Sequence, residues 1–109
     1  MSLASATVTA PFTTDEHGVV RIGASRVMLE RIVYAFDAGV SAEEIVMSYP
    51  TLELADVYAT IAFILNHRPE IDAYMAKSEA EAERLERKRE RQYPTQELRR
   101  RIRERAAAR

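Results

Sequence analysis

The stretch SAEEIVMSYPTLELADVYATIAFILN, residues 41–66, decides the expected fold. It opens with a capping box, because the Ser41 hydroxyl can accept a hydrogen bond from the amide of Glu44 while the Glu44 side chain returns to the amide of Ser41. Apolar residues then follow at helical spacing until Pro50, which disfavours helical backbone in the residue before it. A longer run of helical spacing starts near Glu53. These features predict a helix-turn-helix pattern: a short helix to about residue 48, a tight turn over 49–52 and a helix over about 53–67.

Two segments before this stretch complete the expected domain. Residues 7–22 alternate between apolar and polar side chains around the run Asp15-Glu16-His17-Gly18, which is typical of a β-hairpin. Residues 29–38 place Leu29, Ile32, Val33 and Phe36 on one helical face, and Gly39 supplies the stop. We therefore expect a mainly α fold, with a short N-terminal β-hairpin that could act as a wing and a three-helix helix-turn-helix core of the homeodomain-like or winged type.

The chain changes character after this core. Pro69 suits the first turn of a further helix, but Leu85 is the only large aliphatic residue in 77–92. The pattern predicts a long charged C-terminal helix, interrupted at Tyr93-Pro94 and followed by an arginine-rich end. We expect two parts: residues 1–76 as the hairpin plus helix-turn-helix domain, and residues 77–109 as a charged, arginine-rich helical tail.

The charge of the chain is divided in the same way. The 109 residues carry 16 Lys and Arg against 17 Asp and Glu, a net charge of -1. Residues 1–76 hold four basic and ten acidic side chains, a net charge of -6, whereas residues 77–109 hold twelve basic and seven acidic ones, a net charge of +5. Such an asymmetry is informative about partners rather than about the fold. It places the expected recognition function in the tail.

The composition excludes several classes of protein. There is no cysteine, so disulfides, thiol catalysis and thiolate metal sites are excluded and a cytoplasmic protein is expected. No apolar stretch approaches the roughly 20 residues that span a bilayer, so no membrane association is expected. His17 and His67 lack a partner ligand at metal-binding spacing, and the scattered glycines form no phosphate-binding loop. We predict no enzyme activity, no catalytic residue, no metal and no cofactor.

The helix expected over 53–67 is apolar on most sides. Residues 53–66 contain no Arg or Lys, which a helix that reads the major groove of DNA needs. The side chains left to face outward begin with Glu53, Asp56 and Thr60, and phosphates would repel the two carboxylates. Packing or dimerisation is therefore the favoured role of this helix. The expected homodimer interface is the stripe Ala55, Ala59, Ala62 and Phe63, with the charged helix as the alternative; the expected contacts to DNA, if DNA is bound, are Arg21, Arg26 and Arg31.

The basic tail contains two charge patterns. Glutamate and arginine alternate over 79–91, which is typical of ion pairs within one solvated helix. Residues 96–109 instead contain six arginines against two glutamates and no lysine, and the planar guanidinium suits bidentate binding of carboxylate or phosphate. An acidic protein surface, a nucleic acid and a purely solubilising role stay open for this end. The candidate partner-binding residues are Arg99, Arg100, Arg101, Arg103 and Arg105.

Three blocks of the sequence form an ordered series: RIGASRVMLE at residues 21–30, AGVSAEEI at 38–45 and YPTL at 49–52, followed by Asp56-Val57. Together they resemble the domain-of-unknown-function 433 (DUF433) family, over about residues 8–76. Ala24-Ser25 stands where that family usually has Gly-Thr before the arginine, and Met28 stands where proline is common.

The resemblance implies a small helix-turn-helix fold, dimeric in many members, and a role as antitoxin for a neighbouring PIN-like ribonuclease. PIN-like nucleases hold metal ions with clustered carboxylates, so an arginine-rich segment could form ion pairs there and exclude metal and RNA. The leading hypothesis is an antitoxin-like protein that binds and inhibits such a toxin and could also bind operator DNA. The alternatives are a DNA-binding transcriptional regulator without a toxin partner, and a structural or interaction protein whose tail only aids solubility.

Overall fold

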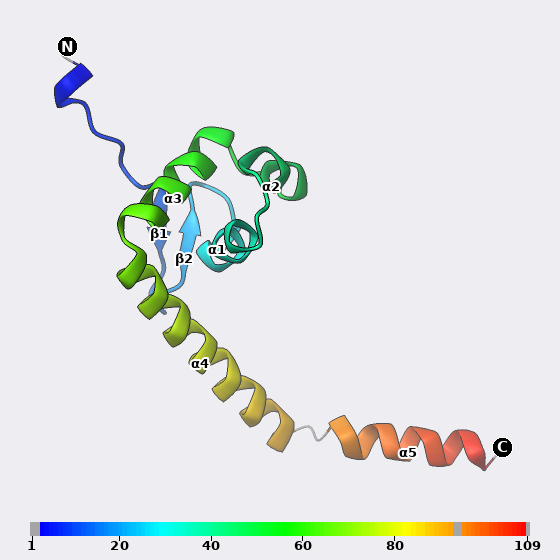
Figure 1. Ribbon diagram of the computed structural model, residues 1–109. Coiled ribbons are helices and arrows are strands. Elements are labelled where there is room, and N and C mark those ends of the chain that lie inside the picture. The colour runs from blue at the N-terminus through cyan, green and yellow to red at the C-terminus, as the bar shows by residue number, and fades with distance from the viewer. Residues whose placement is uncertain (1–2, 93–94, 109) are drawn as a thin grey trace. The chain divides into compact units, whose positions relative to one another are not determined.

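The computed structural model describes residues 3–92 and 95–108, and this part of the chain is mainly helical (Figure 1). A short 3-10 turn precedes two strands and five helices in the described residues. In chain order these are the 3-10 turn Leu3–Ser5, β1 (Phe12–Thr14), β2 (Val20–Ile22), α1 (Leu29–Asp37), α2 (Ala42–Ser48), α3 (Leu54–Asn66), α4 (Arg68–Gln92) and α5 (Thr95–Ala107). The expected fold class is confirmed: an N-terminal hairpin, the helix-turn-helix core of α1, α2 and α3, and a long charged C-terminal helix.

The chain divides into two compact units, residues 1–71 and 72–109. The first unit contains the hairpin, α1, α2, α3 and the first turn of α4. The second contains the rest of α4 and α5.

The strands β1 and β2 form an antiparallel hairpin that is shorter than the alternation over 7–22 suggests. Phe12 pairs with Ile22 at its open end. The connection is fixed by the Asp15 carboxylate, whose Oδ1 accepts hydrogen bonds from the amides of His17 at 2.8 Å and Val19 at 3.0 Å. This is the side-chain turn chemistry for which aspartate is favoured between strands. The first strand begins directly after the proline at position 11, which has no amide hydrogen to donate to a sheet.

The ends of α1 and α2 are fixed by signals in the sequence. After α1, Gly39 adopts φ +85° and its amide donates to the carbonyl of Phe36 at 3.0 Å, so glycine ends the helix in the left-handed conformation. Before α2, the Ser41 hydroxyl accepts from the amide of Glu44 at 3.2 Å, and the Ser41 amide donates to the Glu44 carboxylate at 3.4 Å. The predicted stop and the predicted capping box are both confirmed.

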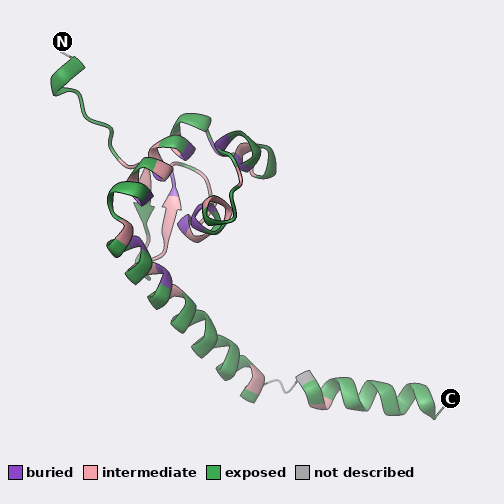
Figure 2. Ribbon diagram, viewed as in Figure 1, coloured by how far each residue is buried: buried purple, intermediate pink, exposed green. Residues whose placement is uncertain are grey.

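The core of the first unit is formed by the inward faces of β2, α1, α2 and α3 together with the first turn of α4 (Figure 2). α3 contributes Val57, Thr60 and Ile64, which recur at helical period on its buried face. The largest fully buried aliphatic side chains of the chain are Ile22, Ile32, Val33, Ile45, Val57, Ile64 and Ile71. All of them belong to the first unit, which therefore has a hydrophobic core of its own.

Thr60 corrects the expected orientation of α3. We expected this side chain to face outward, but its exposed fraction is 0%. Its hydroxyl donates to the carbonyl of Asp56 at 2.8 Å, one turn earlier in the same helix, so the polar atom is satisfied without water. Asp56 is itself half-buried rather than fully outward. Burial of a hydroxyl without a hydrogen-bond partner would destabilise the core, and the bond within α3 avoids that loss.

The second unit consists of helix with few buried side chains. α4 begins at Arg68 and continues to Gln92, so Pro69 lies in its first turn as predicted. Beyond Met75 its residues are mostly exposed, and so are those of α5 (Figure 2). The predicted interruption at Tyr93 and Pro94 lies outside the described residues. Among the helices that the structure describes, none is long and apolar enough to cross a bilayer.

Candidate functional site

The loop between β2 and α1 requires glycine at one position. Gly23 adopts φ +56°, and its amide donates to the carbonyl of Pro11. A Cβ atom on this residue would lie 2.9 Å from Oδ2 of Asp56. The left-handed backbone and the close approach of the carboxylate both favour glycine. Two separate blocks of the sequence, the Arg-Ile-Gly run and the Asp-Val pair, therefore meet here in space.

Ser25 holds the same loop in a tight turn. Its hydroxyl donates to the carbonyl of Ile22 at 2.6 Å and accepts from the amide of Val27 at 3.2 Å. These bonds use the hydroxyl group that serine shares with threonine. Ala24 needs no left-handed backbone, because every described residue with positive φ is a glycine. The departure from the family's Gly-Thr pair is therefore compatible with the turn.

Arg21 forms an ion pair within the hairpin. Its Nη1 lies 2.7 Å from Oδ2 of Asp15. The hydrogen bond from Arg21, together with two backbone amides of the turn, lowers the pKa of the Asp15 carboxyl below its ordinary value of 3.8. Arg68 is paired as well, and donates to both carboxylate oxygens of Asp37 at 3.0 and 2.9 Å. Two of the four arginines of the first unit are thus paired with carboxylates.

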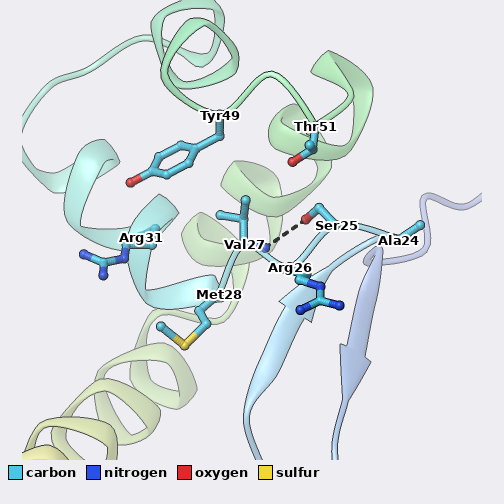
Figure 3. Close-up of a pocket in the computed structure, with 8 residues that line it drawn as sticks. All are labelled: Ala24, Ser25, Arg26, Val27, Met28, Arg31, Tyr49 and Thr51. Atoms are coloured by element: carbon cyan, nitrogen blue, oxygen red, sulfur yellow. Dashed lines mark hydrogen bonds between the residues drawn. The ribbon is translucent and has the colours of Figure 1, made fainter.

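The other two arginines, Arg26 and Arg31, line an open pocket of about 620 Å³ (Figure 3). Arg26 comes from the loop before α1, and Arg31 from the first turn of that helix. Neither side chain forms a hydrogen bond or an ion pair with any residue in the described ranges 3–92 and 95–108. Figure 3 shows their guanidinium groups on opposite sides of the backbone that joins Val27 to Met28. The structure therefore brings these two predicted contacts to one pocket and leaves Arg21 elsewhere.

The turn between α2 and α3 contributes Tyr49 and Thr51 to the same pocket. Their hydroxyl groups have no hydrogen-bond partner among the described residues. In Figure 3 the hydroxyl of Tyr49 points to the side of the pocket where Arg31 lies. No acidic side chain is among the eight residues drawn around the pocket. Sequence reasoning missed Tyr49 and Thr51, because a turn motif does not reveal which distant loop it faces.

The predicted dimer stripe on α3 is divided by the fold. Ala55 and Ala62 are exposed, whereas Ala59 and Phe63 are half-buried. The Phe63 ring packs edge-on against Phe12 of β1, with 4.9 Å between ring centroids, and stacks on His67 at 4.2 Å. Phe63 therefore attaches the hairpin to α3.

The outward face of α3 carries further apolar side chains beside Ala55 and Ala62. Leu54 and Tyr58 are exposed, and Leu65 is 64% exposed. The Tyr58 hydroxyl donates to the Glu43 carboxylate of α2. This hydrogen bond raises the pKa of Tyr58 and lowers that of Glu43. The result is an apolar face that is wider than the predicted alanine stripe.

Within the described residues, some arginines of α5 are paired with glutamates of the same helix, and others are not. Arg100 pairs with Glu97 at 2.7 Å and with Glu104 at 2.8 Å, and Arg101 pairs with Glu97 at 3.2 Å. Glu97 accepts hydrogen bonds from Arg100 and Arg101, and these two bonds lower its pKa, with the bond from Arg100 as the larger cause. The side chains of Arg99, Arg103 and Arg105 have no partner in the described part of the chain. The five predicted partner-binding arginines thus fall into a paired set and an unpaired set.

A narrow apolar stripe runs along α5 between these arginines. Leu98 and Ile102 lie four residues apart on one face, and each is 58% exposed. Arg101 and Arg105 line one side of the stripe together with Glu104, and at 3.6 residues per turn Arg99 lies on the other side. Glu97 and Arg103 lie farther round the helix, each about a third of a turn from the stripe. The stripe is apolar at its centre and mainly cationic at its margins, where Glu104 is paired with Arg100.

A match to a known protein family lies within the first unit. Within residues 3–92 and 95–108, no group of three or more His, Cys, Asp or Glu side chains is placed to hold a metal ion. No curated protein and no solved structure matched the chain. A family profile described as "Protein of unknown function (DUF433)" matches residues 16–64, which include the left-handed glycine of the β2–α1 loop, the capping box and the Asp-Val pair. The predicted resemblance to the DUF433 family is thus confirmed over residues 16–64.

Proposed function

We propose that this protein is a cytoplasmic, antitoxin-like protein without enzyme activity, which binds and inhibits a PIN-like ribonuclease toxin through α5. One observation carries the proposal: α5 exposes Leu98 and Ile102 between arginines, and three of its arginines are free of intramolecular carboxylates in the described residues. The DUF433 match over residues 16–64 supports it, because the resemblance to that family implies an antitoxin role.

The surface of α5 suits the chemistry of such a partner. A PIN-like active site gathers carboxylates around its metal ions, and guanidinium groups form short, paired hydrogen bonds with carboxylates. The apolar stripe adds the burial of Leu98 and Ile102 against the rim of the site, at about 25 cal/mol per Å² of apolar surface buried. Arginines at the metal-binding carboxylates would exclude the metal ions and the RNA together.

The proposal is tested with the purified PIN-like nuclease encoded beside this protein. Addition of the full chain is expected to stop RNA cleavage and to give a complex in size-exclusion chromatography. The inhibition should weaken as Mg²⁺ is raised, because the metal and the arginines compete for the same carboxylates. Full nuclease activity together with the absence of a complex would refute the proposal.

A homodimer formed through α3 completes the proposed assembly. The exposed alanines Ala55 and Ala62 allow a second helix to approach closely, and Leu54 and Leu65 supply apolar area on the same face. A contiguous apolar face on a soluble domain marks a contact surface more often than it marks bare surface. A helix apolar on most sides is commonly shared with another subunit.

A DNA-binding regulator is the second candidate function. The observation that favours it is the presence of two unpaired arginines, Arg26 and Arg31, at one open pocket. α3 offers Glu53 and Asp56 near its N-terminus and no basic side chain, so base reading by this helix is disfavoured. Under this candidate, DNA contacts would be made to phosphates and would carry little sequence information.

A further inference from the structure

The pocket of Arg26 and Arg31 departs from the charge pattern of its unit. Residues 1–71 contain nine acidic and four basic side chains, and the other two arginines of the unit are paired with carboxylates at 2.7 to 3.0 Å. Arg26 and Arg31 have no such partner among the described residues. In a unit with excess acid, two adjacent arginines without carboxylates form a local site for an external anion.

The shape of the site fits an anion with more than one charged group. The two guanidinium groups lie on opposite sides of the Val27–Met28 backbone (Figure 3), so they do not converge on a single point. Between them the pocket is lined by the side chains of Val27 and Met28. The sequence of surfaces is cationic, apolar and cationic again. A nucleic-acid strand carries phosphates at regular intervals, so two separated guanidinium groups can each contact a different phosphate.

Neutral donors stand beside the charges. The hydroxyl groups of Tyr49 and Thr51 reach the pocket from the turn of the helix-turn-helix and have no hydrogen-bond partner in the described chain. Hydroxyl side chains of this kind are common donors to phosphate oxygens in protein–DNA complexes. Asp56 does not line the pocket, and its carboxylate instead lies against Gly23.

We propose that this pocket binds the phosphodiester backbone of a nucleic acid, with Arg26 and Arg31 on two different phosphates of one strand and Tyr49 and Thr51 as neutral donors. The proposal deepens the nucleic-acid-binding candidate and is independent of whether α5 binds a nuclease. It places the nucleic acid against the β2–α1 loop and the α2–α3 turn rather than along α3. Binding there would be insensitive to base sequence, because no base edge is read.

The first test measures fluorescence anisotropy of a labelled double-stranded DNA against the full chain at several salt concentrations. The double variant Arg26→Gln/Arg31→Gln should weaken binding by about tenfold per guanidinium removed. It should also reduce the slope of log K against log salt by about 2, since each phosphate contact contributes about 0.9. The matched control Arg84→Gln/Arg89→Gln removes the same charge from arginines that are paired within α4, and should leave the slope unchanged.

The second test separates hydroxyl contacts from charge. Tyr49→Phe and Thr51→Val each remove one neutral donor, so each should weaken binding by about threefold to tenfold without changing the salt slope. A scrambled DNA sequence should bind as well as the original. A single-stranded RNA probe and inorganic pyrophosphate form the other arms, and pyrophosphate should compete only weakly because a small anion cannot contact two guanidinium groups that do not converge.

Several results would overturn the proposal. The first is that the Arg26→Gln/Arg31→Gln variant binds DNA as tightly as the wild type, with the same slope of log K against log salt. The second is that neither DNA nor RNA binds at low salt. The third is that pyrophosphate binds and nucleic acid does not, which would assign the pocket to a free phosphate. The same double variant should inhibit the PIN-like nuclease as well as the wild type does. Loss of DNA binding with retained inhibition therefore distinguishes this site from α5.

Discussion

The Asp56 carboxylate lies against Gly23, so closely that a Cβ atom at residue 23 would come within 2.9 Å of Oδ2. Gly23 belongs to the loop after β2, and Asp56 belongs to the first turn of α3. The contact joins the hairpin to the second helix of the helix-turn-helix. It also fixes the start of the loop that carries Arg26, so the geometry of the proposed phosphate pocket depends on it.

Substitution of Gly23 should therefore lower the free energy of unfolding more than substitution of a glycine with open space around it. Gly23→Ala combines a left-handed backbone with the clash against Asp56, and should lower the free energy of unfolding by about 2 to 3 kcal/mol. Urea unfolding followed by circular dichroism measures this loss. Gly18→Ala is the matched control, because Gly18 has φ +81° and nothing within 4 Å of its added Cβ; it should lose about 1 kcal/mol. Equal losses in the two variants would mean that the approach of Asp56 carries no steric cost.

Thr60 should tolerate valine better than alanine. Its hydroxyl bonds only within its own helix, to the carbonyl of Asp56. Thr60→Val removes that bond but adds a buried methyl group, so the two effects should cancel to within about 0.5 kcal/mol. Thr60→Ala leaves a void in the core and should lower the free energy of unfolding by about 1 to 2 kcal/mol. A larger loss for valine than for alanine would show that the core cannot accept a methyl group in place of the hydroxyl.

Asp15 should make the hairpin sensitive to acid. Its pKa is lowered in the folded state, first by the hydrogen bond from Arg21, so the ionised carboxylate stabilises the fold. The contribution is fully present above the ordinary pKa of 3.8 and is lost as the pH falls through the lower folded pKa. Asp15→Asn should be less stable than the wild type at neutral pH, and the difference should vanish in strong acid. Urea unfolding across pH measures this, and a pH-independent difference would contradict the assignment.

The oligomeric state should depend on the outward face of α3. Ala62→Glu places a charge on the exposed apolar face, so a dimer formed there should dissociate or aggregate. Light scattering reports the mass. Ala80→Glu, at an exposed position of α4, adds the same charge to the alternative interface and should leave the dimer intact. Phe63→Glu is a poorer probe, because Phe63 packs on Phe12 and its loss would also disturb the hairpin. A dimer that survives Ala62→Glu and dissociates with Ala80→Glu would assign the interface to the charged helix.

Local signals in the sequence predicted the elements well. The capping box at Ser41 and Glu44 and the stop at Gly39 act over a few residues, so their chemistry can be read from the chain directly. The fold class followed from the same signals together with helical spacing.

The environment of single side chains was less predictable. Thr60 is buried because its hydroxyl finds a partner inside α3, and spacing cannot show this. Arg21 and Arg26 are alike in sequence, yet a turn brings Asp15 to one and no described carboxylate to the other. Tyr49 and Thr51 reach the pocket only through tertiary packing of the α2–α3 turn against the β2–α1 loop. Pairing and pocket formation depend on contacts between distant segments, which a single sequence does not encode visibly.

The unpaired arginines of α5 are proposed to bind the acidic site of a PIN-like nuclease. The most direct measurement is the affinity of the neighbouring nuclease for the triple variant Arg99→Gln/Arg103→Gln/Arg105→Gln, by calorimetry. The charge-matched control is Arg84→Gln/Arg87→Gln/Arg89→Gln, whose three arginines are paired with glutamates within α4. We predict that the first variant loses at least about a hundredfold in affinity and that the control loses less than about tenfold. Equal losses, or no loss in the first variant, would contradict the account.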